Sequence, residues 1–209
     1  MGRVWSVAYL PQADSGAAPT DQLIASGSDE KDIKLWHVKT GECVSVLPGN
    51  TGLVFAVAFS PEGRFLASSS DDAAVMLWHV KSGERLKTLT GHVGAVWSVA
   101  FSSDGQILAS CGNDRTVRLW DVQSGECLKT LKGHTGEVWS IAFSPLGSTL
   151  ASGSQDGTVK LWDISTGECL NTLRAIRPYE AMNITAVTSL TEAQKETLKR
   201  LGAVERAEH

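Results

Sequence analysis

Residues 133–163 read GHTGEVWSIAFSPLGSTLASGSQDGTVKLWD, and residues 91–121 read GHVGAVWSVAFSSDGQILASCGNDRTVRLWD. The two stretches begin 42 residues apart and align without insertion or deletion. Self-similarity at a fixed period is the mark of a repeat architecture, in which each copy is one structural unit. The sequence therefore contains a repeated unit of 42 residues.

The same unit extends into the N-terminal half of the chain. A tryptophan that closes a Val/Ile-x-Leu-Trp segment recurs every 42 residues, at Trp36, Trp78, Trp120 and Trp162. A second aromatic position, which follows a valine, recurs at Trp5, Phe55, Trp97 and Trp139. Its first step is eight residues longer than the others, and the excess falls in residues 11–21, whose Pro, Gly and Ala content predicts a surface loop. We expect four copies, at about 3–47, 53–89, 95–131 and 137–173.

Each copy contains four short runs of strand-forming residues separated by turn residues. In the last copy these runs are 138–143, 149–154, 159–164 and 169–173. Ser144-Pro145-Leu146-Gly147 and Gln155-Asp156-Gly157 have the composition of tight turns, so the copy reads as an antiparallel meander. A four-stranded sheet that is apolar on both faces is not stable alone. The copies are therefore expected to stack on one another.

The motifs at the two ends of the copies resemble those of the WD40 β-propeller family. Gly91-His92 and Gly133-His134 stand near the start of a copy, and Trp120-Asp121 and Trp162-Asp163 stand near its end. The resemblance covers about residues 3–173 and implies an all-β fold with four radial blades. Because two end blades would expose apolar faces, we expect a partial ring with one end face covered by the C-terminal tail, half of an eight-bladed homodimer, or part of a longer propeller.

The resemblance also implies a buried hydrogen-bond network in each blade. It joins a histidine, a serine, an aspartate and the closing tryptophan: His92, Ser110, Asp114 and Trp120 in one copy, and His134, Ser152, Asp156 and Trp162 in the next. The same residue types could form a hydrolase triad. A nucleophile is needed only once, however, whereas this set recurs with the blade, so no catalytic residue is predicted and the protein is expected not to be an enzyme.

The first strand of a WD40 blade runs beside the central channel, which implies a binding face at the second aromatic position. The predicted binding residues are Trp5, Phe55, Trp97 and Trp139, with a polar rim of Asp29, Asp71, Asn113, Gln155 and Glu137. Aromatic side chains within a polar rim are typical of protein-binding hot spots. The alternative is that the aromatic residues only plug the channel. We expect a protein or peptide partner, and the acidic rim favours a basic or amphipathic segment.

Composition narrows the possible functions. The 209 residues are 42% apolar and 20% charged, with 19 basic and 23 acidic residues. This net charge of −4 argues against nucleic acid as the partner. No run of 18 apolar residues and no signal peptide is visible, so we expect a cytoplasmic protein with no membrane contact. No motif predicts a cofactor or metal. Cys43, Cys127 and Cys169 follow the same Gly-Glu pair, which predicts equivalent core positions, not disulfide partners.

The period stops after Leu173, and residues 174–209 form a tail. Thr191 and Gln194 form a capping box that predicts a helix over about 192–201, ending at Gly202, with a short strand before it at 182–187. The tail resembles the C-terminal segment of bacterial WD-repeat proteins associated with NB-ARC-like switches. Two functions follow: a protein-binding scaffold, or a C-terminal regulatory fragment of a longer signalling protein.

Overall fold

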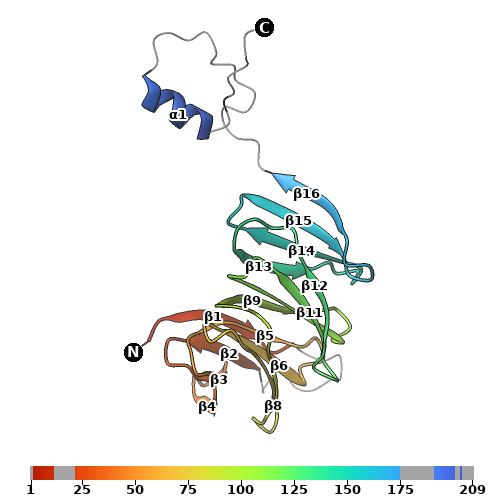
Figure 1. Cartoon of the computed structure of the whole chain (residues 1–209). Helices are drawn as coiled ribbons and strands as arrows, with labels where there is room; N and C mark the ends of the chain where they lie inside the picture. The colour runs from red at the N-terminus through yellow and green to blue at the C-terminus, as the bar shows by residue number, and fades with distance from the viewer. Residues whose placement is uncertain (1, 12–21, 175–190, 201–202, 204–209) are drawn as a thin grey trace. The chain divides into compact units, whose positions relative to one another are not determined.

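The predicted set of four small antiparallel sheets is confirmed. The computed structural model describes residues 2–11, 22–174, 191–200 and 203. In this part of the chain sixteen strands form four sheets, and within each sheet the strands pair in sequence order (Figure 1). We refer to these sheets as blades 1 to 4. They belong to one compact unit, Met1–Leu173, whereas Arg174–His209 forms a second unit.

The blades have nearly identical strand lengths. Blade 1 consists of β1 (Val4–Tyr9), β2 (Leu23–Ser28), β3 (Ile33–His37) and β4 (Cys43–Leu47). Blade 2 consists of β5 (Val54–Phe59), β6 (Phe65–Ser70), β7 (Val75–His79) and β8 (Arg85–Leu89). Blade 3 consists of β9 (Val96–Phe101), β10 (Ile107–Gly112), β11 (Val117–Asp121) and β12 (Cys127–Leu131). Blade 4 consists of β13 (Val138–Phe143), β14 (Thr149–Ser154), β15 (Thr158–Asp163) and β16 (Cys169–Arg174).

The turn residues fix the antiparallel order. In blade 4 the first turn closes where Gly147 N donates to Ser144 O at 2.8 Å, and Gly147 has a φ of +76°, a value that suits glycine. The β2–β3, β6–β7, β10–β11 and β14–β15 turns each hold one residue in the left-handed region. These residues are Lys31, Ala73, Arg115 and Gly157. Only blade 4 has the glycine that this backbone conformation favours.

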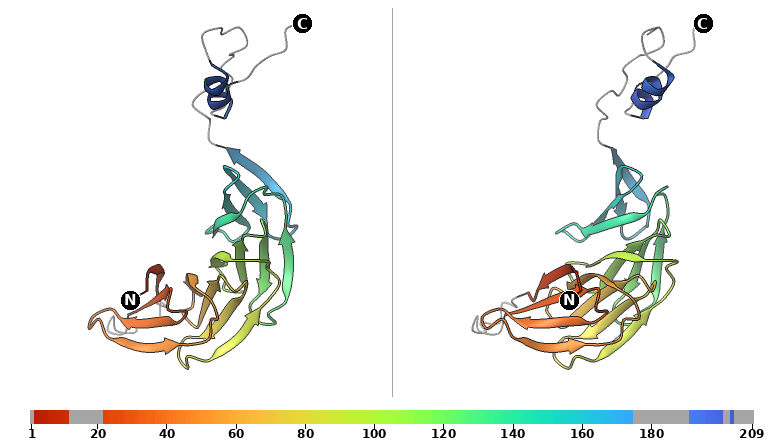
Figure 2. Two further views of the ribbon diagram at one scale, coloured as in Figure 1. Left: turned by 60° about the vertical axis from the view of Figure 1, so that its left-hand side comes forward. Right: turned by 90° about the vertical axis from the view of Figure 1, so that its left-hand side faces the viewer.

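The core lies between blades. Val54 and Val57 on the first strand of blade 2 pack against Ile33, Leu35 and Leu47 of blade 1. Equivalent clusters lie between blades 2 and 3 and between blades 3 and 4. Figure 2 shows the four blades following one another in a curved row. Each blade is thus stabilised by apolar contact with its neighbours, which is the reason that the sequence repeats.

The prediction that three repeated cysteines occupy core positions was wrong. Cys43, Cys127 and Cys169 are exposed at the start of the outermost strands, and the fourth cysteine, Cys111, is buried. All four are free thiols. Arg85 stands at the same place in blade 2, and this charged residue was the signal that the position faces solvent.

The second unit contains the predicted C-terminal helix, α1 (Glu192–Arg200). Its capping box is formed: Thr191 N donates to Gln194 Oε1 at 2.8 Å, and Gln194 N donates to Thr191 Oγ1 at 3.3 Å. The strand predicted at 182–187 lies outside the described residues. In the described part of the chain, no helix has the length and apolar character needed to span a membrane.

Candidate functional site

The four aromatic residues predicted to bind a partner share one backbone feature. In blade 1, Val4 pairs with Ser28 and Ser6 pairs with Gly27, so that Trp5 between them has no partner on β2. The register skips one residue at the same place in the other blades, at Phe55, Trp97 and Trp139. Each aromatic residue is therefore the extra residue of a β-bulge. A bulge bends its strand and re-aims the side chain of the extra residue.

Three of the four aromatic rings form a continuous row across blades 1 to 3. The Trp5 and Phe55 ring centroids are 5.6 Å apart in an edge-to-face arrangement, and those of Phe55 and Trp97 are 4.5 Å apart with tilted planes. Trp139 makes none of the ring–ring contacts found among the described residues, and its side chain is exposed. The structure thus brings together three predicted binding residues and leaves the fourth at the end of the row.

Polar groups hold the N-terminal end of this row. Trp5 Nε1 donates to Asp29 Oδ1 at 2.5 Å, Arg3 Nε donates to Asp29 Oδ2 at 3.1 Å, and the guanidinium carbon lies 4.9 Å from the Trp5 ring centroid. The hydrogen bond from the indole, followed by that from the backbone N–H of Arg3, lowers the pKa of the Asp29 carboxyl. Asp29 is therefore a carboxylate at neutral pH and orients both side chains.

Two other predicted rim residues accept hydrogen bonds at the first strand of their blade. Asp71 Oδ1 accepts a hydrogen bond from Leu53 N at 2.6 Å, and Glu137 Oε2 accepts one from Trp139 Nε1 at 3.4 Å. The Gln155 side chain is exposed. Together with Asp29, the predicted rim contains three carboxylates.

The third blade differs from the first at the equivalent pair. Asn113 occupies the position of Asp29, and Trp97 occupies that of Trp5. Trp97 Nε1 and Asn113 Oδ1 are buried without a hydrogen-bond partner among the described residues. A buried polar atom left unpaired costs about 1–3 kcal/mol. The Trp97 ring is thus held by packing against Phe55 and not by a polar anchor.

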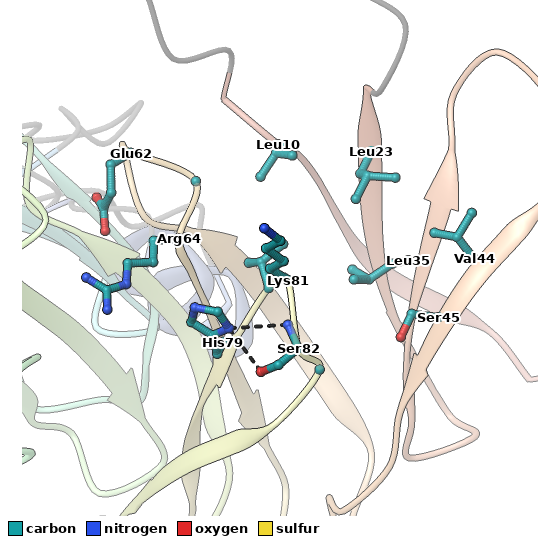
Figure 3. A pocket seen from close by; sticks show the side chains of 13 residues that line it. Leu10, Leu23, Leu35, Val44, Ser45, Glu62, Arg64, His79, Lys81 and Ser82 are labelled. Atoms are coloured by element: carbon teal, nitrogen blue, oxygen red, sulfur yellow. Dashed lines mark hydrogen bonds between the residues drawn. The ribbon is translucent and has the colours of Figure 1, made fainter. Parts of the chain in front are cut away.

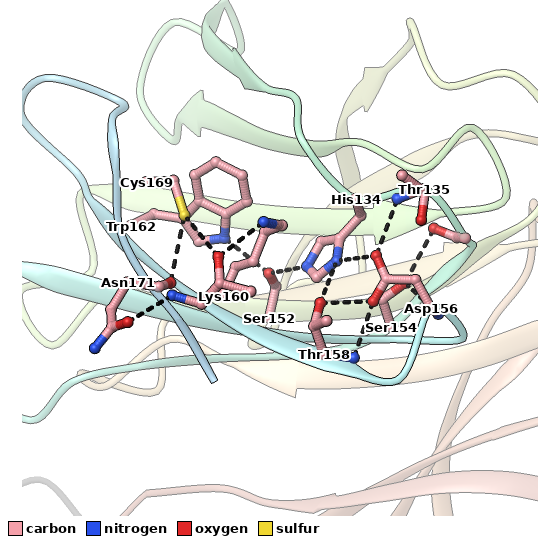
Figure 4. A network of polar contacts seen from close by, with 12 residues as sticks. His134, Thr135, Ser152, Ser154, Asp156, Thr158, Lys160, Trp162, Cys169 and Asn171 are labelled. Carbon is pink, nitrogen blue, oxygen red and sulfur yellow. Dashed lines mark hydrogen bonds and ion pairs between the residues drawn. The ribbon is translucent and has the colours of Figure 1, made fainter. Parts of the chain in front are cut away.

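Blade 4 contains an unbroken chain of hydrogen bonds (Figure 4). Trp162 Nε1 donates to Ser152 Oγ at 2.7 Å, Ser152 Oγ lies 2.8 Å from His134 Nε2, and His134 Nδ1 lies 2.8 Å from Asp156 Oδ2. A carboxylate only accepts, so Nδ1 carries a hydrogen, and in the neutral imidazole Nε2 accepts from the serine hydroxyl. Asp156 also accepts from Thr135 N, which fixes the loop before β13.

Blade 3 repeats this chain. Trp120 Nε1 donates to Ser110 Oγ at 2.8 Å, Ser110 Oγ lies 2.7 Å from His92 Nε2, and His92 Nδ1 lies 2.9 Å from Asp114 Oδ2. Burial lowers the pKa of His92 more than the attraction of Asp114 raises it. Burial raises the pKa of Asp114, but the hydrogen bond from Thr116 and the attraction of His92 outweigh it and leave that pKa low. A neutral imidazole therefore bonds to a charged carboxylate.

The chain becomes shorter toward the N-terminus. In blade 2, Asn50 replaces the histidine: its Oδ1 accepts from Ser68 Oγ at 3.3 Å, and Trp78 Nε1 donates to the same hydroxyl at 3.2 Å. In blade 1 the indole of Trp36 still donates to Ser26 Oγ at 2.8 Å. The serine–tryptophan bond is thus common to all four blades, and it anchors the third strand to the second.

The repeated 42-residue unit, with its serine–tryptophan bond in every blade, matches a known family. The family model described as "WD domain, G-beta repeat" matches residues 2–37, 41–79, 83–121 and 125–163. The chain belongs to the WD40 family. The four WD40 repeats found in this way correspond to the four blades: each match ends with the third strand of a blade, and the second, third and fourth matches begin just before the outermost strand of the preceding blade.

Two groups of relatives illustrate how far the similarity extends beyond the WD40 repeat itself. The chain is 42% identical over 60 residues to nuclear distribution protein PAC1 of Arthroderma otae, a match covering 29% of this chain and 13% of that protein. It is 41% identical over 63 residues to eukaryotic translation initiation factor 3 subunit I of Aspergillus terreus, covering 30% of this chain and 16% of that protein. The similarity therefore extends over a small part of each relative.

The WD40 hydrogen-bond chains have the residue types and distances of a catalytic triad, but the serine is not accessible. Ser152 Oγ lies within hydrogen-bond distance of His134 Nε2, yet it already accepts the indole hydrogen of Trp162, and the Ser152 side chain is buried. Ser110 in blade 3 is bonded and buried in the same way. A nucleophile must reach its substrate. The geometry therefore favours a structural role for both sets.

One cavity was not predicted from the WD40 repeat pattern. It measures about 620 Å³ and lies between blades 1 and 2, where Leu10 and Val44 face Arg64 and Lys81 (Figure 3). No spacing in the sequence indicates it, because its walls come from different copies. Its polar groups do not converge on one point: His79, for example, bonds to Ser82. Nor do the described residues include any cluster of three His, Cys, Asp or Glu side chains suited to a metal ion.

Proposed function

We propose that this chain is a non-enzymatic binding module that captures a protein or peptide segment on the face formed by Trp5, Phe55, Trp97 and Trp139. The binding face is rimmed by the polar residues Asp29, Asp71, Asn113, Gln155 and Glu137. The module acts as a scaffold in a larger assembly, through contact with the partner's side chains.

The observation that carries this proposal is the repeated bulge. A residue that merely filled space between blades could stay in the regular pairing of its strand. Instead, the register skips at each of these aromatic residues, while the flanking Val4, Val54, Val96 and Val138 pair regularly. Bulges are over-represented at sheet edges and next to active sites, where they re-aim a side chain. The exposed rings of Trp5 and Trp139 offer the large, rigid contact area that dominates binding energy at protein interfaces.

The charge of the rim indicates the chemistry of the partner. Asp29, Asp71 and Glu137 place three carboxylates around apolar rings, and the low pKa of Asp29 keeps its charge at neutral pH. A segment carrying lysine or arginine beside leucine or phenylalanine would pair with these carboxylates and bury its apolar side chains on the rings. We therefore propose a basic amphipathic segment as the ligand class.

The test uses two fluorescent synthetic peptides of equal length. One alternates lysine with leucine and phenylalanine, and the other has glutamate in place of every lysine. Fluorescence anisotropy should show tighter binding of the lysine peptide. Trp139→Ala should weaken that binding about tenfold or more, since a hot-spot side chain contributes at least about 1.4–2 kcal/mol. Trp139 is exposed, so the fold should survive the substitution.

Leu146→Ala is the matched control. Leu146 is also a large exposed apolar residue of blade 4, but it lies in the β13–β14 turn, at the other end of β13 from the bulge. Its substitution should leave the affinity unchanged. Equal affinity for the two peptides would refute the ligand class. Equal losses from Trp139→Ala and Leu146→Ala would refute the binding face.

We also propose a cytoplasmic site of action, which the four free cysteines support. The alternative role, as a regulatory C-terminal fragment of a longer NB-ARC-type signalling protein, stays a prediction, because residues 175–190 of the tail that suggested it lie outside the described residues. An ATPase module encoded immediately upstream would favour that role.

A further inference from the structure

One face of blade 1 carries apolar residues that the other blades bury. Val7 on β1 is 65% exposed, whereas the residues at the same position in blades 2, 3 and 4 are at most 7% exposed; these are Val57, Val99 and Ile141. Val4 and Tyr9 on the same strand are also exposed, although their counterparts Val54 and Phe59 are buried. In blades 2 to 4 this face packs against the preceding blade. In blade 1 nothing among the described residues covers it.

The opposite face of blade 4 also exposes apolar residues that the other blades bury. Leu173 on β16 is 47% exposed, whereas its counterparts Leu47, Leu89 and Leu131 are at most 4% exposed. Val159 on β15 is also exposed, and its counterparts Ile33, Val75 and Val117 are fully buried. In blades 1 to 3 this face packs against the following blade.

Glycine positions show the same difference at atomic scale. A Cβ atom placed on Gly27 of blade 1 would lie 2.5 Å from Val54 Cγ1 of blade 2. A Cβ atom on Gly153, the equivalent residue of blade 4, would meet nothing within 4 Å. The counterpart of Val54 in blade 1 is the exposed Val4. The space beside Gly153 is therefore open at the place that the first strand of the next blade occupies beside Gly27.

We propose that two copies of this chain pair head to tail, so that blade 4 of each packs on blade 1 of the other. The two open faces have the residue types and register of the three junctions already inside the chain, and they are the two halves of a fourth junction. Two such contacts related by a twofold axis close a ring of eight blades. Propellers contain about four to eight blades, so a third copy would exceed the range.

Pairing also completes the proposed binding face, and this consequence rests on the proposed function. Inside one chain the aromatic row runs from Trp5 through Phe55 to Trp97, one ring for each successive blade. In the paired ring, Trp139 is followed by Trp5 of the partner subunit. The aromatic row then continues from one subunit to the next. Trp139 of each subunit and Trp5 of the partner subunit lie side by side in one binding face.

The mass in solution tests the pairing directly. One chain has a mass of 22.3 kDa, so light scattering of the full 209-residue chain after gel filtration should give about twice that value. Val7→Asp should return the mass to that of one chain, because the aspartate would lie buried in the new junction. Leu146→Asp, a matched substitution at an exposed turn position away from both faces, should leave the doubled mass unchanged.

A cysteine pair tests the register. At the first internal junction, the Cβ position on Gly27 lies 3.2 Å from Val54 Cβ, close to the about 3.5–4.5 Å of a disulfide. Val4→Cys with Gly153→Cys transfers this pair to the proposed junction, in a chain whose exposed Cys43, Cys127 and Cys169 are replaced by serine. Mild oxidation should join two chains covalently, and neither single variant should do so. Cys111 stands at the position of Gly153 in blade 3, beside Val138, so a cysteine fits there.

A folded species with the mass of one chain at all concentrations would overturn the pairing, as would growth beyond two chains into open assemblies. Failure of the double-cysteine variant to cross-link at a doubled mass would overturn the proposed register. These results are separate from those of the peptide assay. A single chain that still binds the lysine peptide through Trp139 would refute the pairing and keep the function, and a doubled mass without peptide binding would do the reverse.

Discussion

Replacing Ser110 by alanine should destabilise the protein far more than the loss of one small hydroxyl suggests. Ser110 Oγ is fully buried between two partners: it accepts from Trp120 Nε1 at 2.8 Å and donates to His92 Nε2 at 2.7 Å. Alanine leaves a buried donor and a buried acceptor unpaired. Each costs about 1–3 kcal/mol, so the free energy of unfolding should fall by about 2–6 kcal/mol. That is a large part of the stability of a typical domain.

Ser69→Ala is the control with the opposite expectation. Ser69 is equally buried, on the equivalent strand of blade 2, but its Oγ has no hydrogen-bond partner among the described residues. The alanine substitution removes an unpaired polar atom and leaves no neighbouring polar group without its hydrogen bond. The free energy of unfolding should therefore stay unchanged or rise by about 1 kcal/mol. Both serines are buried on the second strand of a blade. The difference between the two variants therefore separates the contribution of hydrogen bonding to the free energy of unfolding from that of side-chain volume.

Urea unfolding followed by tryptophan fluorescence measures both variants. All samples need the same protein concentration, because association of folded chains adds to the apparent stability. The expected order of midpoints is Ser110→Ala well below the unmodified protein, and Ser69→Ala equal to it or above. Similar losses in the two variants would show that packing, and not the hydrogen-bond chain, stabilises this region. A loss of less than about 0.5 kcal/mol in Ser110→Ala would lead to the same conclusion.

Two further predictions concern pH and backbone strain. Burial lowers the pKa of His92 in the folded state, so the unfolded state takes up the proton first, and the free energy of unfolding should fall as the pH drops below about 6.5. His92→Asn should flatten this dependence in urea titrations at several pH values, and an unchanged pH profile would contradict it. Ala73 has a φ of 68°, so Ala73→Gly should raise the free energy of unfolding by about 0.5–1 kcal/mol in the same assay. Gly157 has a φ of 78°, so Gly157→Ala should lower it. Shifts of the same sign in the two variants would show that the left-handed turn position is not strained.

The strands and their order within each blade followed from local sequence. Strand-forming runs between Pro-, Gly- and Asp-containing turns predicted β13 and β14 with the bounds seen in the structure, and β15 and β16 to within one residue. Neighbouring strands are joined by short turns, so pairing depends mainly on residues close together in the chain. The cysteine prediction was wrong because periodicity shows that positions are equivalent but not which way they face; Arg85 at the same position carried that information.

The candidate site was only partly visible in the sequence. The spacing of Trp5, Phe55, Trp97 and Trp139 identified equivalent residues. Their position in β-bulges was not predicted, because a bulge is a property of how two strands pair, and the number of residues alone does not reveal which one is skipped. Nor did the spacing show that Trp97 Nε1 is buried without a partner while Trp5 Nε1 bonds to Asp29. Whether an indole reaches a hydrogen-bond partner depends on the placement of side chains in space, which the spacing of residues does not record.

The sequence by itself determined the blade: its four strands, its turns and the apolar residues on both of its faces, because these depend on side chains within a few tens of residues of one another. The tertiary structure decided which of those faces is covered. Val7 and Val57 are the same residue at the same position of two blades, and one is exposed while the other is buried. The difference arises only from the presence or absence of a neighbouring sheet. Burial is a property of what packs against a side chain, so repeated sequences can leave unequal surfaces for a partner to cover.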